Sequence, residues 1–216
     1  RFFMKILIVD DHALFRTGLG LLLSQLVPYV QVSQASNAAQ ALAMLDASVR
    51  IRDWINLPTE DMGPEHLQTA VFDAALAFNG KAEAIIGDDL LIHNLPTIHA
   101  VGRASHRAPR LLRLDWGDAT HPHVVLCGKG VCFDTGGLDI KSAEGMRHMK
   151  KDMGGAAHAL GLARMIMQCR LPVRLTLLIP AVENAIAGNA FRPGEVIRTR
   201  KGLSIEIDNT DAEGRL

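Results

Sequence analysis

The stretch NTDAEGRL occupies residues 209–216 and follows the alternating run SIEID at residues 204–208. In an extended segment, residues two apart point to the same side, so Asp211, Glu213 and Arg215 are expected to converge. Two carboxylates on one face repel each other unless a proton or a cation lies between them. We therefore expect a divalent metal ion at these side chains.

The composition is that of a globular chain without a strong electrostatic field. Among 216 residues, 48% are hydrophobic and 21% are charged, and 23 basic residues balance 23 acidic ones. This balance argues against nucleic-acid and membrane partners, and the low aromatic content argues against a base-stacking surface. No signal peptide is visible, and no apolar run reaches the length of a membrane span. We expect one or two domains in a cytoplasmic protein whose natural start is Met4.

The cysteines also indicate a reducing compartment. Cys127, Cys132 and Cys169 are an odd number in a chain of this length, so we expect them to be reduced. Cys127 and Cys132 lie in or near an apolar strand, where packed, inert cysteines are expected.

Hydrophobic periodicity predicts an α/β chain throughout. We expect strands at residues 5–9, 29–33, 82–86, 98–101, 110–116, 124–127, 175–179 and 204–207, and helices at 13–26, 38–45, 64–78 and 154–168. The first four elements, in the order β-α-β-α, are typical of the opening of a doubly wound sheet. Residues 48–53 then read SVRIRD, with charges where a buried third strand would be apolar. We therefore place a junction near residues 47–49, between domains at 1–48 and 49–216.

A glycine-rich turn follows the strand predicted at 124–127. It reads GKGVCFDTGG at residues 128–137 and carries Lys129 and Asp134, with Lys141 seven residues after Asp134. Glycines let backbone and side chains approach a ligand closely. This turn is therefore a candidate ligand site.

A further acid, Asp152, lies just before the helix predicted at residues 154–168. As an alternative to ligand binding, it has the ordinary role of a helix N-cap. Taken together, the acids at strand or helix ends are Asp134, Asp152, Asp211 and Glu213. Four carboxylates are too many for one hard divalent ion but suit two, held about 3.5–4 Å apart around an activated water.

Residues from about 50 to 216 resemble the catalytic domain of the leucyl (cytosol) aminopeptidases, peptidase family M17. NTDAEGRL is the signature of that family, and further blocks occur in the family's order: NLPTEDMGP, HAVGRAS, GKGVCFDTGGLDIK, MKKDMGGAAHALG and LIPAVENAIAGNAFRPGEVI. Thr135, Asp139 and Glu195 depart from the commoner Ser, Asn and Asp. The resemblance implies an α/β fold, a mixed sheet flanked by helices. We expect that domain to be incomplete and C-terminally truncated.

The resemblance implies five metal ligands: Lys129, Asp134, Asp152, Asp211 and Glu213, with Asp134 and Glu213 bridging both ions. The implied ions are Zn or Mn, with Mg as a further choice, and Lys129 would bind as a neutral amine whose pKa the ions lower. Lys141 would polarise the scissile carbonyl, and Arg215 would hold a bicarbonate that acts as general base. The implied reaction removes N-terminal, preferably leucine-like, residues from peptides. The family forms homo-hexamers.

Residues 4–47 have a second resemblance. MKILIVDDHALFRTGLGLLL is similar to the start of a response-regulator receiver domain, in which Asp10 and Asp11 would match the acidic pair that holds Mg²⁺. The phospho-accepting aspartate after the third strand is absent, and phosphotransfer needs that nucleophile. We expect this segment to be an incomplete receiver-like fragment that does not act as a receiver.

Two alternatives to an active aminopeptidase remain at this point. One is a catalytically inactive, truncated fusion product that keeps the metal residues, and the other, disfavoured one is a signalling module. The histidine pairs His121/His123 and His93/His99 are expected to be loop, surface or core residues rather than metal ligands.

Overall fold

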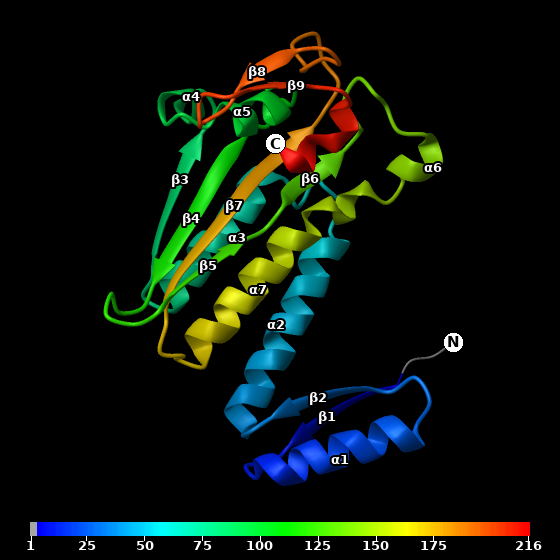
Figure 1. Cartoon of the computed structure of the whole chain (residues 1–216), viewed down its shortest axis with the longest axis vertical. Helices are drawn as coiled ribbons and strands as arrows, with labels where there is room; N and C mark the ends of the chain where they lie inside the picture. The colour runs from blue at the N-terminus through cyan, green and yellow to red at the C-terminus, as the bar shows by residue number, and fades with distance from the viewer. Residues whose placement is uncertain (1–3) are drawn as a thin grey trace.

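The computed structural model describes residues 4–216, and its first elements form a small parallel unit (Figure 1). Strands β1 (Lys5–Val9) and β2 (Gln31–Ala35) pair in parallel, and α1 (Ala13–Leu26) connects them. The predicted β-α-β-α order is present, although β2 lies two residues later than the prediction. The resemblance of this segment to a receiver stays a prediction.

The helix predicted at residues 38–45 is much longer than expected. Helix α2 (Ala38–Asn56) begins at Asn37, whose side chain accepts a hydrogen bond from the Gln40 amide at 2.8 Å. It runs through the expected junction at 47–49 without interruption. The charges of residues 48–53 belong to a helix rather than to a failed strand, because Ile51 and its apolar neighbours Trp54 and Ile55 pack on the core.

The main sheet is mixed and has five strands. Its order is β3 (Lys81–Ile86), β4 (Arg110–Trp116), β7 (Arg174–Asn184) and β5 (His123–Cys127), and β6 (Gly130–Asp134) also pairs with β7. Strands β3 and β7 run antiparallel to β4, whereas β5 and β6 run parallel to β7. β5 pairs with the first part of β7 and ends opposite Leu178, whereas β6 pairs with the last part and ends opposite Asn184.

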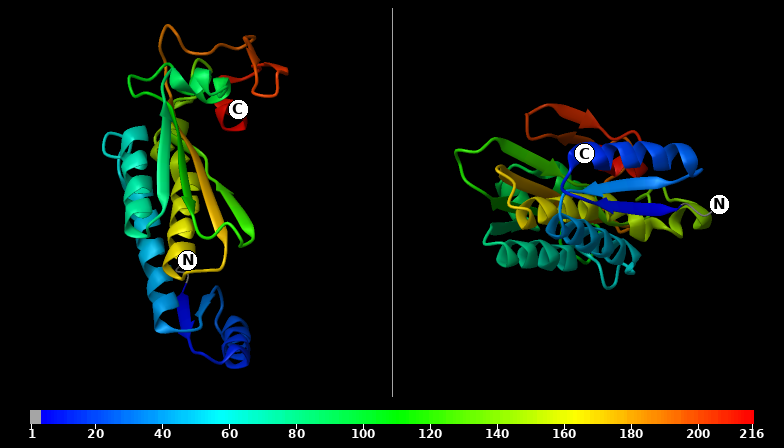
Figure 2. Two further views of the ribbon diagram at one scale, coloured as in Figure 1. Left: turned by 90° about the vertical axis from the view of Figure 1, so that its left-hand side faces the viewer. Right: turned by 90° about the horizontal axis from the view of Figure 1, so that it is seen from below.

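Helices cover one face of this sheet and enclose the main core (Figure 2). Helices α3 (Pro64–Ala77) and α7 (Gly154–Gln168) begin and end within one residue of the predicted bounds. The core between them and the sheet includes the fully buried Leu67, Leu112, Leu160, Leu177 and Ile179. The predicted α/β class, with a mixed sheet flanked by helices, is confirmed.

Short elements gather at the end of the sheet where β6 and β7 end. They are α4 (Asp89–Ile92), α5 (Pro96–Gly102), α6 (Ala143–Met146), β8 (Val196–Arg198), β9 (Ser204–Glu206) and the 3₁₀ helices η1 (Met149–Met153) and η2 (Thr210–Arg215). The strand predicted at 98–101 is wrong, because these residues lie in α5, which Pro96 begins. Val101 packs with Val131, Val182, Phe191 and Ile207 in a second small core that supports this end of the sheet.

Two further sequence expectations can be compared with the structure. Cys132 is buried as predicted, and burial raises the pKa of its thiol, but Cys127 at the end of β5 is exposed, because β5 turns that face away from the core. Within the part of the chain that the structure describes, none of the helices has the length and apolarity that crossing a bilayer requires.

Candidate metal centre

Asp134 lies at the end of β6, directly after an irregularity in the strand. The pairing of β6 with β7 shifts register between Val131 and Phe133, and the Cys132 carbonyl instead accepts a hydrogen bond from the Thr59 hydroxyl at 3.0 Å. Such a bulge bends a strand and changes where its next side chains point. Asp134 is 3% exposed, and its Oδ1 accepts hydrogen bonds from the Gly136 amide and the Asn184 side chain.

The segment that carries Asp211 and Glu213 is not extended as the sequence predicted. It forms the 3₁₀ helix η2, and the Asn209 side chain caps that helix by accepting from the Asp211 amide at 2.7 Å. The two acids nevertheless converge. Oxygens of Asp134, Asp211 and Glu213 lie within 4.8 Å of one another, and within residues 4–216 this is the one His/Cys/Asp/Glu group with metal-binding spacing.

Two lysines join these acids into one site. The Lys129 ammonium lies 2.8 Å from Asp152 and 2.8 Å from Glu213. The Lys141 ammonium lies 3.0 Å from Asp134 and also contacts Asp211. The structure therefore brings together all five expected ligands and Lys141. Asp152 lies in η1 rather than at the start of α7, whose N-cap Met153 makes no side-chain cap bond, so the alternative capping role is not observed.

The charges of the site are strongly coupled. Burial alone would lower the pKa of Lys129. Hydrogen bonds and charge attraction from Asp152 and Glu213 raise it by more, so the pKa of Lys129 lies above its ordinary value. Lys141 shows the same balance through Asp211 and Asp134. Burial, followed by repulsion from Asp134, raises the pKa of Glu213 against the opposing effect of Lys129. Bound dications act in the opposite direction on a lysine amine, which they favour in its neutral form.

Several carboxylate oxygens in the site are suited to a cation. Asp152 Oδ2 and Glu213 Oε1 are buried, and each lies 2.8 Å from the Lys129 ammonium, whereas the second Glu213 oxygen is buried without a hydrogen-bond partner. A buried carboxylate without donors is costly unless a positive charge compensates it. Clustered carboxylate oxygens are the ligands that hard or borderline divalent ions prefer. The residues present therefore fit a divalent metal site.

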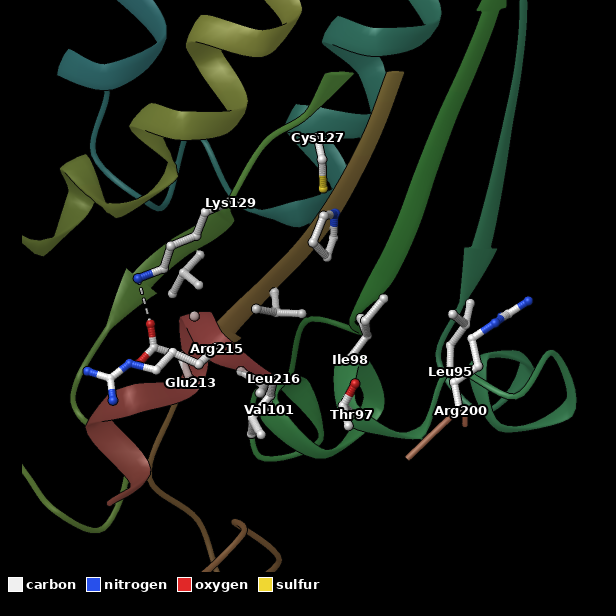
Figure 3. Close-up of a pocket in the computed structure, with 15 residues that line it drawn as sticks. Leu95, Thr97, Ile98, Val101, Cys127, Lys129, Arg200, Glu213, Arg215 and Leu216 are labelled. Atoms are coloured by element: carbon white, nitrogen blue, oxygen red, sulfur yellow. Dashed lines mark ion pairs between the residues drawn. The ribbon is translucent and has the colours of Figure 1, made fainter. Parts of the chain in front are cut away.

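Arg215 lies at the wall of a cavity beside these acids. Figure 3 shows Arg215 next to Glu213, with Lys129 on the other side of the Glu213 carboxylate. The cavity has a volume of about 510 Å³, and its apolar wall includes Ile98 and Val101. One cavity thus combines the charged Lys129, Glu213 and Arg215 with an apolar wall, and Arg200 lies beside Leu95 at its far end.

Sequence reasoning missed two residues of this site, Asn184 and Thr210. Both are buried, and the Asn184 amide donates to Asp134 and to the Thr210 carbonyl. For Asn184, the available sequence signal was a polar residue at the end of a long apolar strand. The histidine pairs belong to no group with metal-binding spacing among the described residues. His99 contacts Asp88, and His123 contacts Thr176.

The mixed sheet and its carboxylate-rich end define an α/β protein with a candidate cation site at the strand ends. The pattern of the cytosol aminopeptidase family, catalytic domain, matches residues 49–216, and the chain belongs to this peptidase family M17.

Known relatives agree with this assignment. Peptidase B of Pectobacterium carotovorum subsp. carotovorum (strain PC1) is 45% identical over 175 residues, which cover 77% of this chain and 40% of that protein. The structure of cytosol aminopeptidase from Coxiella burnetii is similar with a TM-score of 0.81 and 55% identity, covering 87% of this chain and 41% of that one. The bottromycin maturation enzyme BotP in complex with Mn has a TM-score of 0.79 and 33% identity, covering 89% and 43%. The chain thus spans about two-fifths of the length of these relatives.

Proposed function

We propose that this chain carries the metal centre of an aminopeptidase that removes N-terminal residues from peptides. The observation that carries the proposal is the convergence of Lys129, Asp134, Asp152, Asp211 and Glu213 at one end of the sheet. Membership of the cytosol aminopeptidase family supports it. The ions we propose are two divalent metals, Zn or Mn, with Mg as a further choice, and the Mn complex of BotP supports Mn.

The proposed mechanism assigns a role to each group. When bound, the two ions supply a polarised water and Lewis-acid activation of the peptide carbonyl. Lys141 donates a hydrogen bond to the carbonyl oxygen as negative charge develops there. The Arg215 guanidinium would hold a bicarbonate, whose planar oxygens match its fork of donors, and that bicarbonate would supply a general base.

The cavity beside the acids supports a leucine-like preference. Its apolar wall, which includes Ile98 and Val101, offers an aliphatic side chain an apolar surface in the same cavity as Lys129 and Glu213. We propose peptides as the partners and the cytoplasm as the compartment, and we expect neither nucleic acid nor membrane as a partner. The homo-hexamer of the family is an expectation for the whole protein.

The test combines metal content with turnover in the purified chain. We expect about two metals per chain by elemental analysis, with hydrolysis of Leu-p-nitroanilide in added Mn²⁺. Asp211→Ala should abolish both. The matched control is Asp208→Ala, an exposed aspartate three residues earlier, which should leave both unchanged.

A folded wild-type sample with neither metal nor turnover would overturn the proposal. That result would favour the alternative, a catalytically inactive fusion product that keeps the metal residues. Circular dichroism on the same sample establishes that it is folded.

A further inference from the structure

Thr210, the residue before Asp211, is fixed by both its backbone amide and its hydroxyl. Its amide donates to Asp139 Oδ2 at 2.8 Å, and its hydroxyl donates to the Gly136 carbonyl at 2.6 Å while accepting from the Asp139 amide at 2.9 Å. Thr210 is 0% exposed. The first residue of η2 is therefore anchored to the loop that follows β6 without any hydrogen bond from Thr210 to the five expected ligands or to Lys141.

Asn184 provides a second connection between the same segments. Its side-chain amide donates one hydrogen bond to Asp134 Oδ1 at 2.9 Å and one to the Thr210 carbonyl at 3.0 Å. Its backbone carbonyl accepts from the Thr135 amide at 3.0 Å and from the Thr135 hydroxyl at 2.8 Å. Because Asn184 is 1% exposed and uses both amide hydrogens, one buried side chain ties Asp134 to the segment that carries Asp211 and Glu213.

The glycine at position 137 makes this close approach feasible. Gly137 has a φ of 66°, and an added Cβ would lie 2.9 Å from the Thr210 hydroxyl and 3.0 Å from Asn184 Oδ1. A side chain here would be strained by the backbone and would separate the two residues. The loop after β6 is thus shaped to pack directly against Asn184 and Thr210.

We propose that Asn184, Thr210 and Asp139 form a clamp that places Asp134 beside Asp211 and Glu213 before any metal binds. Asn184 and Thr210 are positioning residues, because they act through the carboxylates rather than on a substrate. Clustered carboxylates repel one another, and the clamp adds neutral donors to the Lys129 and Lys141 ammoniums that pair with these acids. The inference rests on the proposed metal-binding function.

The experiment measures metal affinity and metal-free structure in the full chain. Binding of Mn²⁺ is followed by the loss of the free-ion signal in electron paramagnetic resonance. Hydrogen exchange with mass spectrometry, in the presence of a chelator, reports on residues 208–216 and, as an internal reference, on α7. The variants are Asn184→Ala, Thr210→Val and Thr210→Ser. The control is Asn189→Ala, an exposed asparagine that bonds Arg103 and lies outside the clamp.

We expect Asn184→Ala and Thr210→Val to weaken Mn²⁺ binding roughly 10- to 100-fold, the usual cost of removing a group that orients metal ligands. In the metal-free chain, both should accelerate exchange of residues 208–216 without changing α7. Thr210→Ser keeps the hydroxyl and should restore affinity to within about threefold of wild type. Asn189→Ala should match wild type.

Wild-type affinity and wild-type exchange in both Asn184→Ala and Thr210→Val would overturn the clamp. Rapid exchange of residues 208–216 in the metal-free wild type would overturn it as well. If Asn184→Ala loses the α7 protection and is therefore unfolded, the comparison of Thr210→Val with Thr210→Ser decides alone. A protected segment in a wild-type chain that binds no Mn²⁺ would instead refute the proposed function and leave the clamp intact.

Discussion

At the scale of single residues, the position of Lys129 depends on the space that Gly214 leaves. A Cβ added at Gly214 would lie 2.8 Å from Lys129 Cε and 3.0 Å from its Nζ. We expect Gly214→Ala to displace the amine from Glu213 and to weaken Mn²⁺ binding roughly tenfold, because the ligand loses its geometry. The free energy of unfolding should change by less than about 1 kcal/mol, since the end of a flexible side chain can move.

The matched control is Gly188→Ala, because an added Cβ there meets no atom within 4 Å. Isothermal titration with Mn²⁺ and thermal unfolding of both variants give the two quantities. Equal affinities in the two variants would show that the placement of Lys129 does not contribute to binding.

Glu195 gives a residue-scale prediction on pH. Hydrogen bonding to Arg103, at 2.9 Å, is the main cause that lowers the pKa of Glu195 below its ordinary value of 4.5. As the pH falls, the unfolded chain therefore takes up this proton before the folded chain does. The stabilisation is complete above the ordinary pKa and is lost as the pH falls through the folded value. Urea unfolding should therefore show that Glu195→Gln loses less of its free energy of unfolding than wild type does when the pH falls below the ordinary pKa of Glu195.

The control for this prediction is Glu206→Gln, because Glu206 is exposed on β9. Its acid dependence should follow that of wild type. If Glu195→Gln and Glu206→Gln lose stability in parallel with wild type on acidification, the Arg103 pair does not contribute.

The sequence predicted the candidate ligands well, but it did not predict the residues that hold those ligands in place. Each candidate acid lies beside glycines or at an element end, which is a local signal. The contact between Asn184 and Thr210 joins residues 26 apart, and that between Asp139 and Thr210 joins residues 71 apart. Such contacts depend on how β6, β7 and η2 pack, and no local pattern encodes them.

At the scale of elements, the errors arose where a local pattern was ambiguous. Residues 98–101 contain β-branched side chains that favour a strand, but Pro96 starts a helix, and Ile98 and Val101 share one helical face. Residues 48–53 have the spacing of a helix. The charges in this short stretch hid that spacing, because they were compared only with the pattern of a buried strand. NTDAEGRL was read as extended from alternate charges, whereas the Asn209 cap makes η2 a 3₁₀ helix.

The packing of α2 on α7 gives the prediction for this scale. Ile51 of α2 lies directly over Gly161 of α7, where an added Cβ would clash with the Ile51 side chain. Gly161→Val should lower the free energy of unfolding by about 1–3 kcal/mol through overpacking. Gly18→Val in α1, where nothing lies within 4 Å of an added Cβ, should change it by less than about 0.5 kcal/mol.

Urea unfolding followed by circular dichroism measures both variants. If Gly161→Val were as stable as Gly18→Val, α2 would not pack against α7 as the structure shows, and the predicted junction inside α2 would be supported.

At the scale of the whole molecule, the β1–α1–β2 unit and the candidate metal centre lie at opposite ends, with α2 running between them (Figure 1, Figure 2). Helix α1 exposes large apolar side chains to solvent, among them Leu14 at 80% and Leu26 at 75%. Clustered exposed apolar side chains favour association between molecules. The first unit is therefore expected to add self-association rather than stability.

Two truncations separate these contributions and test the boundary predicted near residue 48. Removal of residues 1–36 keeps the Asn37 cap and all of α2, so the unfolding free energy should stay within about 1 kcal/mol and self-association should fall. Removal of residues 1–48 also deletes Ala47, which is 4% exposed, and Asp46, which lies 3.6 Å from Arg164. That loss of packing and of a charge partner should cost at least about 2 kcal/mol. Urea unfolding and sedimentation velocity measure the two effects. Equal stability of both truncations would place the stability boundary at the predicted junction, whereas a gap between them would place it at Asn37, where α2 begins.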